Sequence, residues 1–296
     1  MLLLCRSIRR FAGALQAAPL TVMTPSRVEP PTETTRAALA RLDVEFLHVP
    51  INDEEPVLPF ANKVFAGALL EERCREDVIV FADSDSIFTA EPRELLLPAG
   101  HAAAVRPVNS PQVASSGPGD RHEPFWEGVH RLCGTSPPPF VRTAVSGDRV
   151  HAYFNSGLVA VRREAGMMTQ WRSDFLRLMR ARHVPPSGKI NQLDQVALAV
   201  TLARRPAEVQ VLDARHNYPL PLRDRMPEPQ RSAALEDLVH VHYFRSLHEP
   251  GFLERLGVAT DGPIGMWLAP HLPLEPVEHA HAPRPVYQLP SPASRD

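Results

Sequence analysis

Two aspartates separated by one serine follow an apolar run in the stretch VIVFADSDSIF, residues 78–88. In extended backbone, Asp83 and Asp85 leave the same face with Cα atoms about 6.7 Å apart. Bare carboxylates about 4 Å apart repel by roughly 4 kcal/mol at an effective dielectric of about 20, so water, a shared proton or a cation must offset the repulsion. Carboxylate oxygens suit Mg²⁺ or Mn²⁺. Because a strand-end turn or a helix cap has the same spacing, the pair alone leaves both interpretations open.

The segments around this pair predict alternating strands and helices. Short apolar runs predict strands at residues 20–23, 44–50, 78–83, 102–108, 157–163, 208–213 and 238–244. Helical spacing of apolar residues predicts helices over 57–72, around 171–179 and over 193–200. This alternation indicates an α/β protein with a mostly parallel sheet covered by helices. Ligands of such sheets bind outside the carboxyl ends of the strands, where Asp83 and Asp85 lie.

The composition narrows the class of protein. The chain has 296 residues, of which 44% are hydrophobic, so it can bury a sizeable core. Its net charge of -2 and pI near 6.7 argue against nucleic acid as a partner. No run approaches the roughly 20 apolar residues of a membrane span. Three unpatterned cysteines fit a reducing compartment, and we expect a cytoplasmic protein.

The two ends and one internal segment differ from the rest of the chain. Arginines interrupt the apolar N-terminus, so we do not expect a signal peptide there. An amphipathic transit peptide and an ordinary first helix leading into the strand at 20–23 both stay open. The proline-rich stretch 107–139 predicts a long loop. We expect a domain over residues 1–265 and a proline-rich, disordered tail over 266–296.

Five motifs, taken in order, resemble those of one enzyme family. They are FANKVFA, VIVFADSDSIFTAEP, YFNSGLVAVRRE, NQLDQVALAV and VHVHYF. In this order they resemble the GT-A-fold glycosyltransferases, closest to the retaining, glycogenin-like and bacterial galactosyltransferase-like group, over roughly residues 20–250. The resemblance implies a Rossmann-like mixed sheet flanked by helices. It leaves open whether the family's first strand is present, since the chain opens on a predicted helix.

The resemblance also implies roles for particular residues. Asp83, Ser84 and Asp85 match the D-x-D motif, whose aspartates hold a divalent metal, usually Mn²⁺, on the diphosphate of a nucleotide sugar. Asn155, with Ser156 and Gly157, matches the N-[SA]-G motif that approaches the donor sugar. Without the family, Asn-Ser-Gly is equally a tight turn leading into a strand.

Two further motifs complete the implied donor site. Asp194 and Gln195 resemble the D-Q pair beside the reacting carbon and the sugar hydroxyls, although an aspartate in the first turn of a helix is favourable without any function. Lys63 corresponds to a basic residue that reaches the phosphates or the sugar; the alternative is a solvated lysine on an amphipathic helix.

The metal's third protein ligand in the family is a histidine in a late H-[YF] step. His242, followed by Tyr243, matches it, but His240 lies on the same strand face, and either could be a buried core histidine. The family continues with Gly and then Lys-Pro, whereas this chain has RSLHEP. Arg245 and His248 are candidates for the missing positive charge, although nothing in the sequence assigns it to them.

The resemblance implies a metal-dependent enzyme that transfers a hexose from a nucleotide sugar, a UDP-sugar by preference, to an acceptor glycan, lipid or protein, with retention at the anomeric carbon. Two alternatives stay open. One is a non-catalytic GT-A-like module that binds nucleotide sugars. The other is a haloacid-dehalogenase-type phosphatase, in which Asp83 would be the nucleophile and Asp85 the general acid or base, although the late acidic motif of that class is absent.

Overall fold

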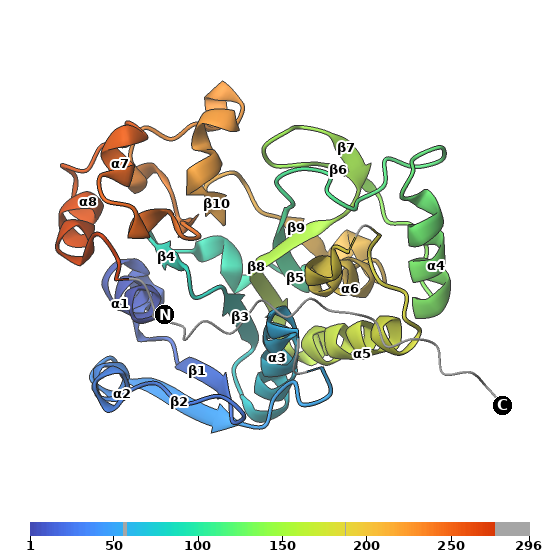
Figure 1. Ribbon diagram of the computed structural model, residues 1–296, viewed down its shortest axis with the longest axis horizontal. Coiled ribbons are helices and arrows are strands. Elements are labelled where there is room, and N and C mark those ends of the chain that lie inside the picture. Colours follow the sequence, from blue (N-terminus) through green and yellow to red (C-terminus); the bar gives the residue numbers. More distant parts are fainter. Residues whose placement is uncertain (56–57, 187, 276–296) are drawn as a thin grey trace.

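The computed structural model describes residues 1–55, 58–186 and 188–275 as a mixed α/β structure (Figure 1). Its strands are β1 (Leu20–Pro25), β2 (Val44–Val49), β3 (Val78–Ala82), β4 (Ser86–Phe88), β5 (Ala103–Pro107), β6 (Phe140–Arg142), β7 (Arg149–His151), β8 (Phe154–Arg162), β9 (Val209–Val211), β10 (Tyr218–Pro219) and β11 (His240–His242). Its helices are α1 (Leu2–Phe11), α2 (Glu33–Ala40), α3 (Asn62–Arg73), α4 (Glu123–Cys133), α5 (Met167–Arg180), α6 (Leu193–Leu202), α7 (Phe252–Arg255) and α8 (Pro263–Leu268). Every strand and helix predicted above has a counterpart here.

The central sheet has the strand order β3-β8-β5-β9. Within this sheet, the pair β5–β9 is parallel, whereas the pairs β3–β8 and β5–β8 are antiparallel. The α/β class is therefore confirmed, but the expectation of a mostly parallel sheet does not describe this core. The apolar sequence of β8 indicates a strand that is buried on both faces. A central strand is buried in this way whether its neighbours are parallel or antiparallel.

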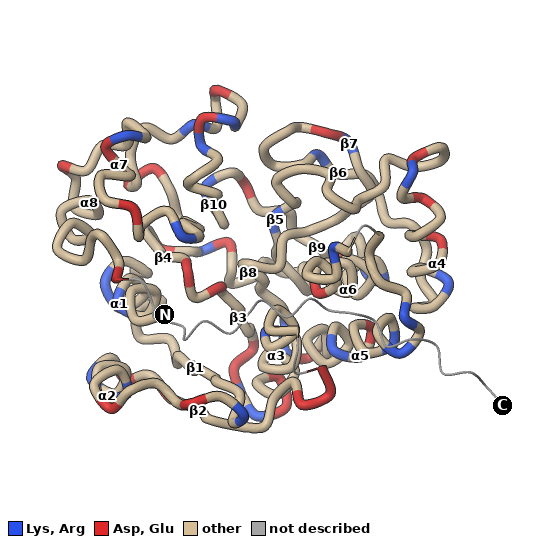
Figure 2. The backbone as a smooth tube through the Cα atoms, in the orientation of Figure 1, with Lys and Arg blue, Asp and Glu red and all other residues tan. Residues whose placement is uncertain are grey.

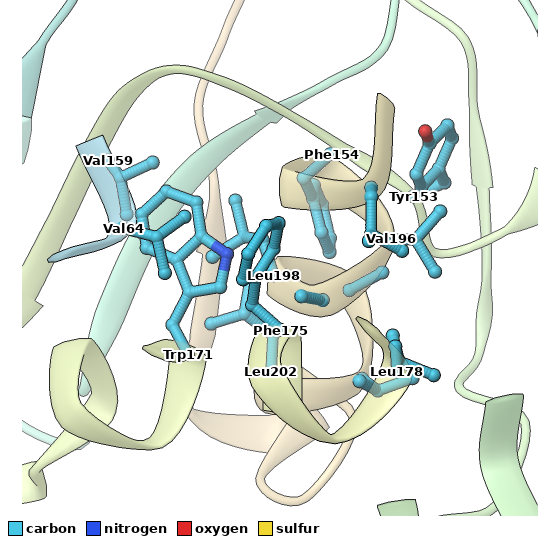
Figure 3. Packing of buried hydrophobic residues seen from close by; sticks show 14 of the residues in the cluster. Val64, Tyr153, Phe154, Val159, Trp171, Phe175, Leu178, Val196, Leu198 and Leu202 are labelled. Atoms are coloured by element: carbon cyan, nitrogen blue, oxygen red, sulfur yellow. The ribbon is translucent and has the colours of Figure 1, made fainter. Parts of the chain in front are cut away.

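Alternate residues of β8 face two different apolar layers. Val159 and Val161 pack with residues of α3, α5 and α6, including Trp171 and Phe175 (Figure 3). Leu158 and Ala160 belong to a second cluster on the opposite face, which contains Leu4 of α1. Because side chains alternate along a strand, both faces of β8 are covered by apolar residues, and the sheet lies between two apolar layers.

The N-terminal segment forms helix α1 and then leads into strand β1. Helix α1 packs beside β4, where Ser7 Oγ accepts a hydrogen bond from the Phe88 backbone N–H at 3.0 Å. Strands β1 and β2 pair in parallel, and α2 connects them in the sequence. The described chain opens on α1, as expected, and a strand–helix–strand unit lies between this helix and α3.

Two expectations about irregular segments differ from the structure. Helix α4 lies within the predicted loop at 107–139. It has a proline in its first turn and ends at Gly134, which is in the left-handed conformation. Both features are typical of helix ends, but the many prolines of this stretch favoured the loop prediction. Helix α8 continues past the expected domain boundary at residue 265, and Leu268 is buried. The rest of the expected tail, 276–296, lies outside the described residues. None of the described helices is long and apolar enough to span a bilayer.

Candidate active site

Three chain segments meet at the turn that follows β3. The Asp83 backbone N–H donates to Gly157 O at 2.8 Å, which ties the turn to β8. The Tyr243 backbone N–H donates to Asp85 O at 3.1 Å, which ties the turn to the end of β11. Figure 2 shows acidic residues along this turn between β3 and β4. The backbone therefore brings the D-x-D, N-S-G and H-Y motifs to one place.

Potential metal ligands converge there. One ligand atom from each of Asp83, Asp85 and His242 lies within 4.8 Å of the others. His242 Nε2 is 3.2 Å from Asp85 Oδ1 and 4.0 Å from Asp83 Oδ2. Burial alone would raise the pKa of Asp85, but the hydrogen bond and charge of His242 outweigh it and lower that pKa. Two carboxylates and one imidazole form a donor set that suits Mn²⁺ or Mg²⁺ and leaves positions for phosphate oxygens.

His240, the alternative histidine, lies elsewhere. Its Nε2 is 2.9 Å from Ser86 Oγ, and its ring packs edge-on against Phe88. The side chain is fully buried, and burial lowers its pKa well below the ordinary value. Among the two histidines of β11, only His242 therefore faces the aspartates in the described structure.

The N-S-G motif occupies an irregular part of β8. The register between β5 and β8 shifts between Val105 and Arg106, so that β8 bulges at this motif. Asn155 Oδ1 accepts a hydrogen bond from the Gly157 N–H at 2.8 Å. A Cβ atom at Gly157 would lie 3.0 Å from both Asp83 Oδ2 and His242 Nδ1. Any other residue would crowd the candidate metal ligands, because the backbone passes directly against their side chains.

Lys63 links this cluster to the D-Q motif. Its Nζ lies 2.7 Å from Asp83 Oδ1, 3.3 Å from Ser156 Oγ and 3.8 Å from Asp194 Oδ2. Burial alone would lower the pKa of Lys63, but the charges of Asp83 and Asp194 outweigh it and raise that pKa. The side chain is thus buried in the site, and the solvated-lysine interpretation is wrong. A sequence signal was available: Lys63 is one of two lysines among 32 basic residues.

Asp194 lies in the first turn of α6, and its side chain is buried. Ser156 Oγ donates to Asp194 Oδ2 at 2.6 Å, and the Trp171 indole N–H donates to Asp194 O at 2.7 Å. Burial raises the pKa of this carboxyl despite the nearby Lys63. Asp194 Oδ1 and Gln195 Oε1 have no hydrogen-bond partner among the residues that the structure describes. Such unpartnered acceptors are what a site for sugar hydroxyls would offer.

Other expected residues have simpler surroundings. The backbone carbonyl of Ser84 accepts a hydrogen bond from the Met1 amino group at 2.9 Å. His248 Nδ1 lies 2.9 Å from Leu274 O, away from the aspartates, and Arg245 is exposed.

One site residue has no sequence signal. Asn217 lies in a loop before β10, and its amide is 3.1 Å from His242 Nδ1 and 2.8 Å from Asn155 Oδ1. No motif marks it, because its place depends on the path of that loop.

Comparison with known proteins agrees with this geometry. Residues 1–205 match the Rhodobacterales glycosyltransferase domain family. The chain belongs to that family. This glycosyltransferase also resembles, at 16% identity and a TM-score of 0.51, the structure of galactosyltransferase LgtC in complex with donor and acceptor sugar analogs; the match covers 94% of this chain and 93% of that one. An active-site mutant of LgtC gives 16% identity and a TM-score of 0.50, with 94% of each chain covered.

The apo form of mouse xyloside xylosyltransferase 1 gives 18% identity and a TM-score of 0.46, with 82% of this chain and 90% of that one covered. No curated protein matches the glycosyltransferase. The LgtC matches establish the GT-A fold, and the family match speaks against the phosphatase alternative.

Proposed function

We propose that this glycosyltransferase transfers a hexose from a UDP-sugar to an acceptor glycan, lipid or protein in a metal-dependent reaction that retains the anomeric configuration. The observation that carries the proposal is the cluster of Asp83, Asp85 and His242 beside Lys63 and Asp194. Two carboxylates and an imidazole at this separation form a donor set for a divalent ion, and the charge of such an ion would offset the repulsion between the carboxylates. Gly157 keeps the space beside them open.

A Mn²⁺ or Mg²⁺ ion bound by Asp83, Asp85 and His242 would neutralise the charge that develops on the leaving nucleoside diphosphate. Lys63 adds a fixed positive charge beside Asp83. Because this ammonium is already positioned and largely shielded from water, it costs no reorganisation when the sugar–phosphate bond breaks.

The residues on the other side of Lys63 face the sugar in this proposal. Ser156 and Lys63 hold the Asp194 carboxylate through Oδ2. Oδ1 is buried without a partner among the described residues, and we propose that it meets a sugar hydroxyl or the reacting carbon when the donor binds. Gln195 offers a second unpartnered oxygen. Asn155 is proposed to approach the donor from the bulge of β8.

The choice of donor has its own support. LgtC is a galactosyltransferase, and its structure contains donor and acceptor sugar analogs. UDP-galactose therefore stands first among the donors to be tested. A cytoplasmic location is proposed from the three cysteines, all of which are free thiols in the structure.

A hydrolysis screen tests this function without an acceptor. UDP-galactose, UDP-glucose and their GDP counterparts are incubated with the protein in Mn²⁺ or in EDTA, and released nucleoside diphosphate is measured. We expect Mn²⁺-dependent release from a UDP-hexose, with the anomer of the released sugar read by NMR. A protein that binds UDP but releases none from any donor, with or without saccharide acceptors, would be the non-catalytic module instead.

A further inference from the structure

The ring of His242 contacts Asn217, a residue outside all five motifs. Both side chains are buried. His242 Nδ1 lies 3.1 Å from Asn217 Oδ1, and the other ring nitrogen, Nε2, faces Asp85. An imidazole bound in this way presents one definite nitrogen to a cation only if its other nitrogen keeps the proton.

The hydrogen-bond network determines which atom of the Asn217 amide faces the histidine. The Gly157 backbone N–H can only donate, so the Asn155 side-chain atom that it meets at 2.8 Å is the oxygen. The Asn217 atom 2.8 Å from that same oxygen must then be the amide nitrogen. The remaining Asn217 oxygen faces His242 Nδ1, which must carry a proton in order to donate to it.

The backbone of Asn217 is held as firmly as its side chain. Its φ is +45°, in the left-handed region where asparagine is tolerated better than most residues. The buried guanidinium of Arg106 donates to Asn217 O at 2.7 Å. Arg106 Nη2 has no partner among the described residues, and burial lowers the pKa of Arg106 to about 10. A buried cation that donates to this carbonyl is costly, which indicates that the position of the loop matters.

We propose that Asn217 is a positioning residue that keeps a proton on His242 Nδ1 and holds the Nε2 atom toward Asp83 and Asp85, whether or not Nε2 also carries a proton in the metal-free protein. The same amide donates to Asn155, so it connects the candidate metal ligand to the N-S-G motif. In this proposal Asn217 acts through these two side chains and is not itself a metal ligand. The benefit to metal binding rests on the function proposed above, whereas the state of the ring can be measured in metal-free protein.

The first measurement follows the ring proton by NMR on protein labelled with ¹⁵N-histidine. The chain has 13 histidines, and the His242 signals are assigned by their loss in His242→Gln. We expect a hydrogen-bonded Nδ1–H in the wild type and its loss, or much faster exchange, in Asn217→Gly. Glycine accepts the left-handed backbone and keeps the carbonyl that Arg106 binds, so the variant removes the amide alone.

Asn52→Gly is the matched control. Asn52 is also buried and left-handed, at φ +56°, and its amide donates to Leu58 O and Asn62 Oδ1 and not to His242. It should lose similar folding interactions and keep the Nδ1–H signal. If Asn217→Gly does not fold, Asn217→Asp replaces it. Its carboxylate accepts from Nδ1–H but donates nothing to Asn155, so the signal should persist.

The second measurement is Mn²⁺ affinity without nucleotide, obtained from the EPR signal of free Mn²⁺. Loss of an outer partner of a ligating histidine typically weakens metal binding about 10- to 100-fold, and we expect that range for Asn217→Gly and no change for Asn52→Gly. A wild-type His242 protonated on Nε2 alone, an unchanged Nδ1–H in Asn217→Gly, or its loss in Asn217→Asp would overturn the inference. A wild type that has the Nδ1–H but binds no Mn²⁺ would overturn the proposed function instead.

Discussion

The ammonium nitrogen of Lys63 lies 2.7 Å from Asp83 Oδ1, so an aspartate of the proposed metal site also forms a largely buried ion pair. The other oxygen of Asp83 faces His242. Asp83 is therefore shared between a fixed protein cation on one side and the proposed metal on the other. Two charges therefore have different proposed roles: the Lys63 ammonium supports the leaving group, and the Asp83 carboxylate binds the metal ion. Substitutions can test these two roles separately.

Replacing Lys63 tests the fixed charge. Lys63→Met should lower kcat by about 10²-fold, the effect typical of removing one preorganised group that stabilises developing negative charge. Mn²⁺ affinity should not fall, because Asp83 loses a competitor for its oxygen. Lys189→Met, which removes the chain's other lysine, is the control and should leave kcat unchanged. A loss of Mn²⁺ binding in Lys63→Met with normal circular dichroism would contradict this division of roles.

Asp194 should trade stability against activity. Because burial raises its folded-state pKa above the ordinary value of 3.8, an ionised Asp194 destabilises the fold at neutral pH, and this cost disappears as pH falls below that value. Asp194→Asn should therefore be as stable as the wild type or more stable at pH 7, by urea unfolding, with the difference shrinking toward pH 3.5 or so.

The same variant should lose activity. We expect kcat of Asp194→Asn to fall about 10²- to 10⁴-fold, the range for removing a group that acts at the reacting centre, with UDP affinity preserved. Reduced stability together with lost UDP binding would show instead that Asp194 is a structural cap of α6.

Gly157 should tolerate no side chain. A Cβ there would lie 2.8 Å from Asn155 Oδ1 and 3.0 Å from Asp83 Oδ2, so Gly157→Ala must displace the side chains of the candidate site. We expect Mn²⁺ binding to weaken by about 10-fold or more. Gly67→Ala is the control, since its Cβ would meet the flexible Met168 side chain at 2.9 Å and should affect stability alone. Equal Mn²⁺ affinity in both variants would disprove the close approach.

Ligand-induced stabilisation should distinguish the two histidines of β11. UDP at a hundred times its Kd adds about 2.7 kcal/mol to the free energy of unfolding, or a rise of roughly 5 °C in Tm, and we expect this only with Mn²⁺ present. His242→Ala should shrink the rise. His240→Ala should lower the starting Tm, because His240 is buried against Ser86 and Phe88, but keep the rise. A rise that is the same without metal contradicts the prediction.

Local sequence patterns predict most of the elements and much of the site. Apolar runs predict the strands because burial requires them, and the carboxyl end of β3 predicts where Asp83 and Asp85 lie. The direction of a strand could not be predicted, because an apolar run has the same pattern in either direction. Strand β8 is antiparallel to β3 and β5. Asn217 and Arg106 could not be predicted, because their roles depend on a left-handed loop and a buried hydrogen bond between segments 111 residues apart.

The most direct test is the release of UDP from UDP-sugars, UDP-galactose first, by the wild type and Asp85→Asn, each in Mn²⁺ and in EDTA. Asp85 is the more exposed of the two aspartates, with 42% of its side chain accessible, so its replacement should leave the fold intact. The wild type should release UDP from at least one UDP-hexose in Mn²⁺, and either EDTA or Asp85→Asn should reduce the rate by about 10²-fold or more. Equal rates under all four conditions, or no release by the wild type from any UDP-hexose, would contradict a metal-dependent glycosyltransferase.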